Sequence, residues 1–282
     1  MALVSMKTLL QEAEKDNYGV GAFSIANMEM IMGVIKAAEE KKSPAILQIA
    51  QVRLPYSPLS LIGPMMIAAA KNASVPIAVH FDHGLTYDSI KEALELGFTS
   101  VMMDASNLPI QENIKLVSMV RRLADTYGAA VEAEVGQLAG SEDGSVNHVM
   151  YYSDPKEVKE LYEHTGVDAI ALSIGNAHGL YKNEPRLKFD LLEQSRKLVP
   201  IPLVLHGGSG ITTEGFRRCI DGGIRKINIA TANFLAAEEG VRKYCEGELK
   251  DYFAMSHGMM LSIYENVAKH MDIFGSTGKA DR

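Results

Sequence analysis

Three histidines of this chain stand directly before a glycine at the end of a short apolar run. His83 lies in HFDHG, His178 in SIGNAHG and His206 in LVLHGGSG. A following glycine lets a ligand approach the backbone closely. Three neutral imidazoles that leave a fourth position open form a catalytic zinc site, in which the metal acts as a Lewis acid on a carbonyl.

The alternative for each histidine is a polar loop residue or a hydrogen-bonded core residue. For any one histidine alone this interpretation is the better one, but three histidine–glycine pairs in the same setting favour a metal site. The other histidines lack this placement and keep the structural interpretation: His80, His148, His164, His257 and His270.

Carboxylates accompany these histidines. Asp82 adjoins His83 and is a candidate for proton transfer to the oxygen on the reacting carbon, or for a hydrogen bond that orients a metal ligand. Asp104 and Glu134 follow or end other apolar runs. They are candidates for a second or transient metal position, or for buried hydrogen-bonded groups.

An acidic loop, QLAGSEDG at residues 137–144, combines glycines with Glu142 and Asp143. Such a composition suits a mobile lid that carries a general base. A solvated acidic turn is the alternative, and it would be preferred without the rest of the constellation.

Two glycine- or hydroxyl-containing loops have the composition of a phosphate site. HGGSG at 206–210 and NIATA at 228–232 follow the last two apolar runs. Backbone amides and hydroxyls at helix N-termini bind anions there. The candidate phosphate-binding residues are Gly207, Gly208, Ser209, Asn228, Ala230 and Thr231.

The elements that must position these residues alternate between short β-branched runs and helical-period stretches along the whole chain. This pattern predicts an α/β fold, a (β/α)₈ TIM barrel spanning residues 1–282 as a single catalytic domain. An additional C-terminal helix lies within 250–282. Because strand ends of a barrel converge on one mouth, the candidate residues are expected to meet there. The predicted strands are residues 19–23, 44–49, 76–81, 99–103, 130–135, 168–173, 202–206 and 224–229.

Helical periodicity and glycine punctuation support the same assignment. Residues 109–126 place Ile110, Ile114, Val117, Val120 and Leu123 on one helical face. We expect helix C-terminal turns at Gly97, Gly128, Gly166 and Gly222.

Composition excludes several classes of protein. The 282 residues are 47% hydrophobic and carry a net charge of −7 with no long basic run, which argues against nucleic acid as a partner. Cys219 and Cys245 are too few for a disulfide framework, which fits a cytoplasmic protein. The N-terminal segment is no signal peptide and no stretch of 18 apolar residues exists, so membrane association is not expected. We expect a small-molecule substrate and a homo-oligomer, a dimer or a tetramer.

In their order, the segments FDHG, VEAEVG, EDG, IGNAHG, LVLHGGSG and KINIAT resemble those of class II fructose- and tagatose-bisphosphate aldolases. The likeness covers nearly the whole chain. The opening LVSMKTLL and the closing FGSTGKA resemble the shorter, tagatose-type branch.

This resemblance implies a metal-dependent aldolase that reversibly cleaves a ketose (bis)phosphate into dihydroxyacetone phosphate and an aldehyde through a zinc-stabilised enediolate. It implies Zn²⁺ or a similar divalent ion on His83, His178 and His206, and a monovalent cation, Na⁺ or K⁺, near the phosphate. Asp82 would be the acid/base for the aldehyde-derived oxygen and Glu142 the base for the ketone. Dihydroxyacetone phosphate would be held by Gly179, Gly207, Gly208, Ser209, Asn228, Ile229, Ala230 and Thr231.

Two positions depart from the family pattern. Ser24 stands where the family usually has asparagine, and Ala50 where many fructose-specific members have serine. Both are expected to face the aldehyde half of the substrate. We therefore expect an unchanged dihydroxyacetone phosphate half, whereas the identity of the aldehyde stays open and need not be glyceraldehyde 3-phosphate.

Three other functions stay open from the residues alone. Lys226 is a candidate for Schiff-base formation in a class I aldolase, although a lysine that neutralises the barrel interior is the simpler interpretation. Three histidines and an acid would also suit a zinc-dependent hydrolase. A sugar-phosphate sensor or assembly subunit needs the ligands but not both Asp82 and Glu142.

Overall fold

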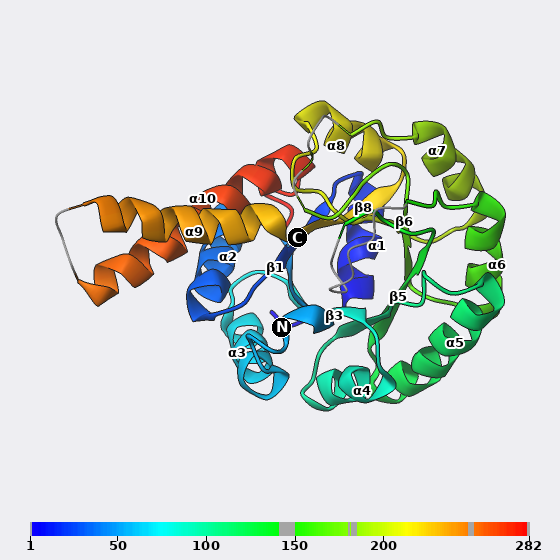
Figure 1. The fold of residues 1–282 in the computed structure, drawn as a ribbon, viewed down its shortest axis with the longest axis horizontal. Coiled ribbons are helices and arrows are strands. Elements are labelled where there is room, and N and C mark those ends of the chain that lie inside the picture. Colours follow the sequence, from blue (N-terminus) through cyan, green and yellow to red (C-terminus); the bar gives the residue numbers. More distant parts are fainter. Residues whose placement is uncertain (1, 141–149, 180, 182–184, 248–250, 281–282) are drawn as a thin grey trace.

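The computed structural model describes residues 2–140, 150–179, 181, 185–247 and 251–280. Eight parallel strands form a closed barrel in chain order, with the last strand paired to the first (Figure 1). The predicted TIM barrel is confirmed. The strands are β1 Val20–Ser24, β2 Ala45–Ala50, β3 Ile77–Gly84, β4 Ser100–Met103, β5 Ala130–Val135, β6 Ala169–Leu172, β7 Leu203–Leu205 and β8 Ile224–Ile229.

Helices form the outer layer, because their apolar faces pack on the outward side of the strands. In α5, Ile114, Val117 and Val120 are buried, as their spacing predicts. The helices of the ring are α2 Met28–Lys41, α3 Leu59–Asn72, α4 Tyr87–Glu95, α5 Ile110–Tyr127, α6 Pro155–Thr165, α7 Phe189–Leu198, α8 Thr213–Asp221 and α9 Thr231–Glu246, with a short 3₁₀ helix η1 at Gln51–Arg53.

A first helix, α1 Met6–Asp16, covers the N-terminal ends of the strands. Its residues Met6, Leu9 and Leu10 are buried against small and branched residues of the barrel interior, such as Ala22 and Val204. We call this end of the barrel the floor. The opposite end, where the strands have their carboxyl ends, is the mouth.

The predicted C-terminal helix is also present. It is α10 Tyr252–Phe274, which packs along α9 and α2, and the α9–α10 pair projects from the side of the barrel (Figure 1). Among the helices of the described chain, none is long and apolar enough to span a membrane.

One local prediction differs from the structure. Strand β3 continues to Gly84 instead of ending at residue 81, because the pairing with β4 shifts register between Phe81 and Gly84. Asp82 and His83 therefore lie within the strand. Gly222 is the C-cap of α8, as predicted, and keeps a helical backbone, while the following Gly223 is left-handed with φ of 105°. Gly97, Gly128 and Gly166 have the expected positive φ.

Candidate active site

Three imidazoles meet at the mouth. His83 comes from β3, His178 from the loop after β6, and His206 directly follows β7. The ring centroid of His83 lies 5.1 Å from that of His178 and 4.6 Å from that of His206. One nitrogen of each ring lies within 4.8 Å of the other two, which is close enough to share one metal ion. The strand ends thus bring together the histidines that the sequence singled out.

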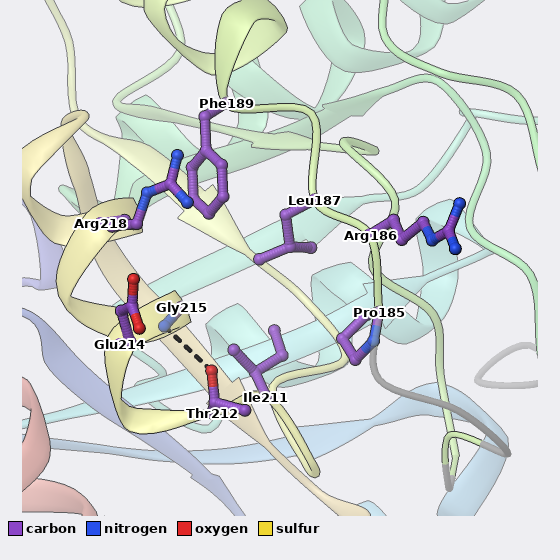
Figure 2. Close-up of a pocket in the computed structure, with 9 residues that line it drawn as sticks. All are labelled: Pro185, Arg186, Leu187, Phe189, Ile211, Thr212, Glu214, Gly215 and Arg218. Carbon is purple, nitrogen blue, oxygen red and sulfur yellow. Dashed lines mark hydrogen bonds between the residues drawn. The ribbon is translucent and has the colours of Figure 1, made fainter.

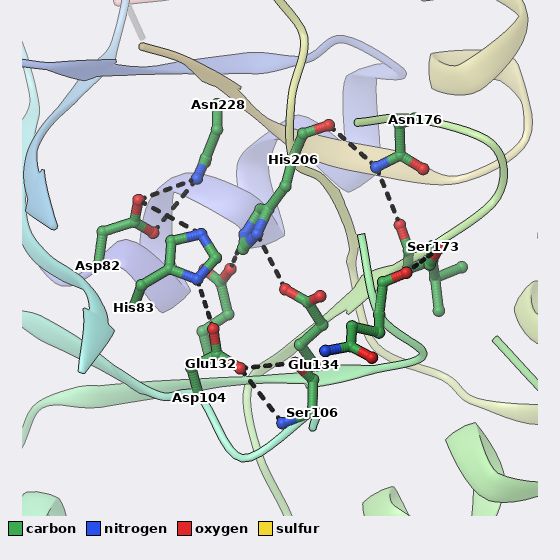
Figure 3. Close-up of polar contacts among 12 residues, drawn as sticks. Asp82, His83, Asp104, Ser106, Glu132, Glu134, Ser173, Asn176, His206 and Asn228 are labelled. Atoms are coloured by element: carbon green, nitrogen blue, oxygen red, sulfur yellow. Dashed lines mark hydrogen bonds and ion pairs between the residues drawn. The ribbon is translucent and has the colours of Figure 1, made fainter. Parts of the chain in front are cut away.

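Two carboxylates orient these rings. His83 Nδ1 lies 2.6 Å from Asp104 Oδ2, and His206 Nε2 lies 2.7 Å from Glu132 Oε1 (Figure 3). A carboxylate on one ring nitrogen fixes the tautomer and directs the other nitrogen toward a metal. Among the described residues, the buried His83 Nε2, His178 Nε2 and His206 Nδ1 have no hydrogen-bond partner. Buried polar atoms are rarely left so, and the donor set fits a divalent ion.

Asp82 lies beside this cluster and is held by two side-chain amides. Asn228 Nδ2 lies 3.2 Å from both carboxylate oxygens (Figure 3). Gln48 Nε2 donates to Asp82 Oδ2 at 3.1 Å. Burial alone raises the pKa of Asp82, but the charges of His83 and Lys226 outweigh it and hold the pKa well below its usual range. Asp82 is therefore a fixed carboxylate at the edge of the cavity.

Asp104 and Glu134 approach the imidazoles from β4 and β5. Together with His83 they form a second group of potential ligands within 4.8 Å of one another. Glu134 Oε2 also lies 3.1 Å from His206 Nδ1. This arrangement permits the second or transient metal position, although Asp104 already accepts hydrogen bonds from His83 and Ser106.

The carboxylates favour positive charge on the imidazoles. Burial alone lowers the pKa of His206, but the hydrogen bond with Glu132 and the carboxylate of Glu134, whose Oε2 lies 3.1 Å from Nδ1, raise it to about 9. Burial also lowers the pKa of His83, and the charge of Asp82 with the hydrogen bond to Asp104 raises it well above its usual value. The negative charge of these carboxylates can be balanced either by a proton on the imidazoles or by a bound metal cation.

A buried network beneath the site contains Lys226, as the interpretation of this lysine as a neutralising group of the interior predicted, but the contacts among its other members were not predicted. Lys226 Nζ lies 3.0 Å from Glu132 Oε2 and donates to Asn228 Oδ1 at 2.6 Å. His80 Nε2 lies 3.6 Å from both Asp82 and Glu132. The sequence does indicate these neighbours, because side chains two residues apart on a strand share a face. His80 lies two residues before Asp82, and Glu132 lies two residues before Glu134.

The loops after β6, β7 and β8 surround a small cavity next to the imidazoles. Ser209 Oγ accepts from the Ala232 backbone N–H at the start of α9, which ties the last two loops together. The N–H of Gly208 donates to Asn228 O, and Ile229 is a buried core residue. The cavity is lined by Gln48, Asp82, His83, His178, Gly179, Gly207, Ser209, Asn228, Ala230 and Thr231.

Ser24 and Ala50 lie at the ends of β1 and β2, next to Asp82. Ser24 Oγ accepts from Gln48 Nε2 at 3.1 Å, and this same amide nitrogen donates to Asp82. Ala50 is the register partner of Asp82 across β2 and β3. Both residues are nearly fully buried. Glu142 and Asp143 lie outside the described residues.

A larger cavity, of about 910 Å³, lies elsewhere. It is lined by residues preceding α7 and by the first turns of α8, where the Arg218 guanidinium stacks 3.8 Å from the Phe189 ring centroid (Figure 2). None of the predicted site residues lines it. The candidate active site is therefore identified by the side chains that meet at the mouth and not by the volume of a cavity.

Similarity to known proteins agrees with this geometry. The family model for fructose-bisphosphate aldolase class II matches residues 4–279. The chain belongs to the class II fructose-bisphosphate aldolase family. It is 41% identical to a fructose-bisphosphate aldolase of Geobacillus stearothermophilus and 38% identical to a probable fructose-bisphosphate aldolase of Bacillus subtilis. The first alignment covers 99% of each chain, and the second 99% of this chain and 100% of the relative.

Solved structures give the same result. The YdjI aldolase of Escherichia coli K12 has a TM-score of 0.89 at 33% identity, over 99% of this chain and 100% of the other. A putative fructose-1,6-bisphosphate aldolase of Coccidioides immitis has a TM-score of 0.91 at 30% identity, over 98% of each chain. The predicted family and the prediction of a metal-dependent aldolase acting on a sugar phosphate are confirmed, and class I and hydrolase chemistry are not favoured.

Proposed function

We propose that the cluster of His83, His178 and His206 binds one zinc ion and that the cavity beside it binds dihydroxyacetone phosphate. The proposal rests on three buried imidazoles. Each offers one ring nitrogen within 4.8 Å of a nitrogen of the other two, and each has one ring nitrogen without a hydrogen-bond partner among the described residues. When bound, a divalent ion supplies Lewis-acid stabilisation of charge on the oxygen of the ketone.

The phosphate is proposed to lie against Gly179, Gly207, Ser209, Ala230 and Thr231, which line the cavity. Thr231 begins α9, so the positive end of a 16-residue helix faces the same space. Gly208 and Ile229 were predicted to bind the phosphate, but Gly208 N–H donates to Asn228 O and Ile229 is buried. We propose that these two residues only shape the backbone of the loops. A Na⁺ or K⁺ ion near the phosphate stays a prediction.

Asp82 is proposed to transfer the proton at the aldehyde-derived oxygen. Gln48 and Asn228 donate to both of its oxygens and hold the carboxylate in one orientation at the cavity. A positioned carboxylate of this kind gives up and takes back a proton without a large movement. Glu142 remains the proposed base for the ketone carbon.

Lys226 is proposed to be a structural counter-ion, not a Schiff-base nucleophile. Its ammonium is fully buried, 3.0 Å from Glu132 and hydrogen-bonded to Asn228. A lysine nitrogen held between a carboxylate and an amide oxygen is not placed to attack a ketone.

The test is the cleavage of fructose 1,6-bisphosphate and tagatose 1,6-bisphosphate, with and without borohydride. We expect dihydroxyacetone phosphate as a product and no covalent trapping by borohydride. Changing Glu142 to Ala should slow tritium exchange at the ketone carbon of dihydroxyacetone phosphate in the absence of any aldehyde. Borohydride inactivation in the presence of substrate would overturn the proposal. Unchanged tritium exchange in Glu142→Ala would show that another residue is the base, and Asp143 would be tested next.

The physiological aldehyde, a homo-oligomer of two or four chains and a cytoplasmic location are predictions that the sequence supports. A panel of aldehydes condensed with dihydroxyacetone phosphate and a measurement of mass in solution test the first two.

A further inference from the structure

Two side chains in the loop after β6 reach across to the backbone of the loop after β7. Asn176 Nδ2 donates to His206 O at 3.0 Å (Figure 3). The Tyr181 hydroxyl donates to Gly207 O at 2.7 Å and accepts the Ala177 N–H at 2.9 Å. We call Asn176 and Tyr181 the loop clasp.

The clasp begins where the strand pairing stops. In the described ladder, β6 and β7 pair only at Ile170 with Leu203 and at Ala171 with Val204. Both clasp bonds lie beyond the last pair, toward the mouth. They continue the connection between the two segments that follow β6 and β7, after the backbone pairing of these strands has ended.

The atoms joined by the clasp adjoin the proposed site on both sides. Ala177 directly precedes His178, and Gly207 directly follows His206. Gly207 also approaches Ala177 so closely that a Cβ at position 207 would lie 2.1 Å from Ala177 O. The spacing of these two loops is therefore fixed by direct contact and by one phenolic hydroxyl.

The ring of Tyr181 is placed as firmly as its hydroxyl. A Cβ at Gly210 would lie 3.0 Å from the ring, so the phenol packs on the far end of the same glycine loop. Burial raises the pKa of Tyr181 to about 12, so the hydroxyl keeps the proton that it donates to Gly207 O. Asn176 is fully buried, and its Oδ1 accepts the Ile174 N–H at 2.8 Å.

We propose that Tyr181, assisted by Asn176, is a positioning residue that sets the separation of Gly179 and Gly207 and thereby the phosphate site between them. This inference rests on the proposed function, in which these loops bind the phosphate. Tyr181 is not assigned contact with the reacting atoms. Its effect should appear in the binding of phosphate and only weakly in turnover.

The experiment compares Tyr181→Phe with Tyr127→Phe, a matched loss of one hydroxyl at the floor end of α5. Both variants are saturated with divalent ion, and their metal content and thermal denaturation are measured first. Inorganic phosphate is then tested as a competitive inhibitor of cleavage. Removing the hydroxyl leaves Ala177 N–H and Gly207 O without this partner, so we expect the inhibition constant and the KM of the ketose bisphosphate to rise on the order of tenfold. We expect kcat to stay within about threefold, because Asp82 is held by other residues.

A third variant, Ser209→Ala, separates the inference from the function on which it rests. If Ser209→Ala weakens phosphate inhibition and Tyr181→Phe does not, the clasp is wrong and the phosphate site stands. If neither variant changes phosphate inhibition, both the positioning role of the loop clasp and the proposed phosphate site are wrong. Asn176→Ala removes the other half of the clasp and should shift phosphate inhibition in the same direction, which keeps the inference testable if Tyr181→Phe does not fold. A drop in kcat with unchanged phosphate inhibition would also overturn it.

Discussion

The floor and the mouth of the barrel both hold buried or half-buried charges, but they balance them differently. At the floor, Glu14 meets two arginines, with Oε1 2.5 Å from Arg196 and Oε2 3.1 Å from Arg225. Asp168 likewise meets Lys7 at 2.9 Å and Arg121 at 2.5 Å. Both of these acids have permanent cations of the protein as partners.

At the mouth, four carboxylates gather around the imidazoles. Within the described part of the chain, Lys226 is the only lysine or arginine that pairs with them, at 3.0 Å from Glu132 and 3.8 Å from Asp82. The remaining carboxylates are Asp104 and Glu134, which face His83 and His206. The comparison shows that these acids of the floor are paired with permanent cations, whereas the carboxylates of the mouth are balanced mainly by imidazoles, which can take up a proton or a metal ion.

The largest expected effect comes from removing an imidazole. Changing His178 to Ala takes away one of three proposed ligands, and loss of Lewis-acid stabilisation worth several kcal/mol lowers kcat/KM by about 10³-fold or more. The measurement is cleavage of fructose 1,6-bisphosphate after dialysis against metal-free buffer. A change of His164 to Ala, on the exposed surface of α6, serves as the control and should have little effect.

Asp82 provides the next effect. Replacing Asp82 with Ala or Asn should lower kcat by roughly 10²-fold or more, because a positioned proton-transfer group is lost. Metal content and inhibition by inorganic phosphate should stay close to those of the unmodified enzyme. Unchanged turnover would assign Asp82 to a purely structural role.

A matched pair of substitutions compares the two ends directly. Asp104→Asn at the mouth removes the carboxylate on His83 Nδ1 and should weaken metal binding about 10- to 100-fold. Asp168→Asn at the floor removes the partner of Arg121 and of the Val131 N–H, and should lower the free energy of unfolding by about 1.5–3 kcal/mol. Metal titration and denaturant unfolding are measured on both. Equal metal affinity in the two variants would remove the distinction between floor and mouth.

The smallest effect is expected on the aldehyde side. Ser24→Asn introduces a larger amide where Gln48 now donates to the serine hydroxyl, so the wall beside Asp82 changes without touching the imidazoles. We expect the relative KM values for different aldehydes to change several-fold, up to about tenfold, with metal content unchanged. An exclusive preference for glyceraldehyde 3-phosphate in the unmodified enzyme would contradict our interpretation of Ser24 and Ala50.

The barrel was predictable because its signals are local. β-Branched runs and helix-ending glycines define each strand within a few residues, so the eight predicted strands all exist. The end of β3 was missed because a register shift against β4 depends on its neighbour and leaves no local pattern.

The site was predictable only in part. Histidines before glycine at strand ends are visible in a sequence, but the partners of those histidines come from other strands. Glu132 was overlooked, although two-residue alternation with Glu134 places it on the same face. His80 is a buried, hydrogen-bonded histidine, as its structural interpretation predicted, with Nδ1 2.9 Å from Ser100 Oγ. Tyr181 leaves no such signal, because its hydroxyl bonds to a loop 26 residues further along the chain.

The stoichiometry of bound metal tests the central claim most directly. Purified protein is saturated with zinc, freed of excess ion, and analysed by native mass spectrometry alongside His178→Ala and Asp168→Asn. We predict one tightly bound ion per chain in the unmodified protein and in Asp168→Asn, marked loss in His178→Ala, and cleavage activity proportional to metal content. Full cleavage activity in exhaustively chelated protein with no detectable metal would contradict the account.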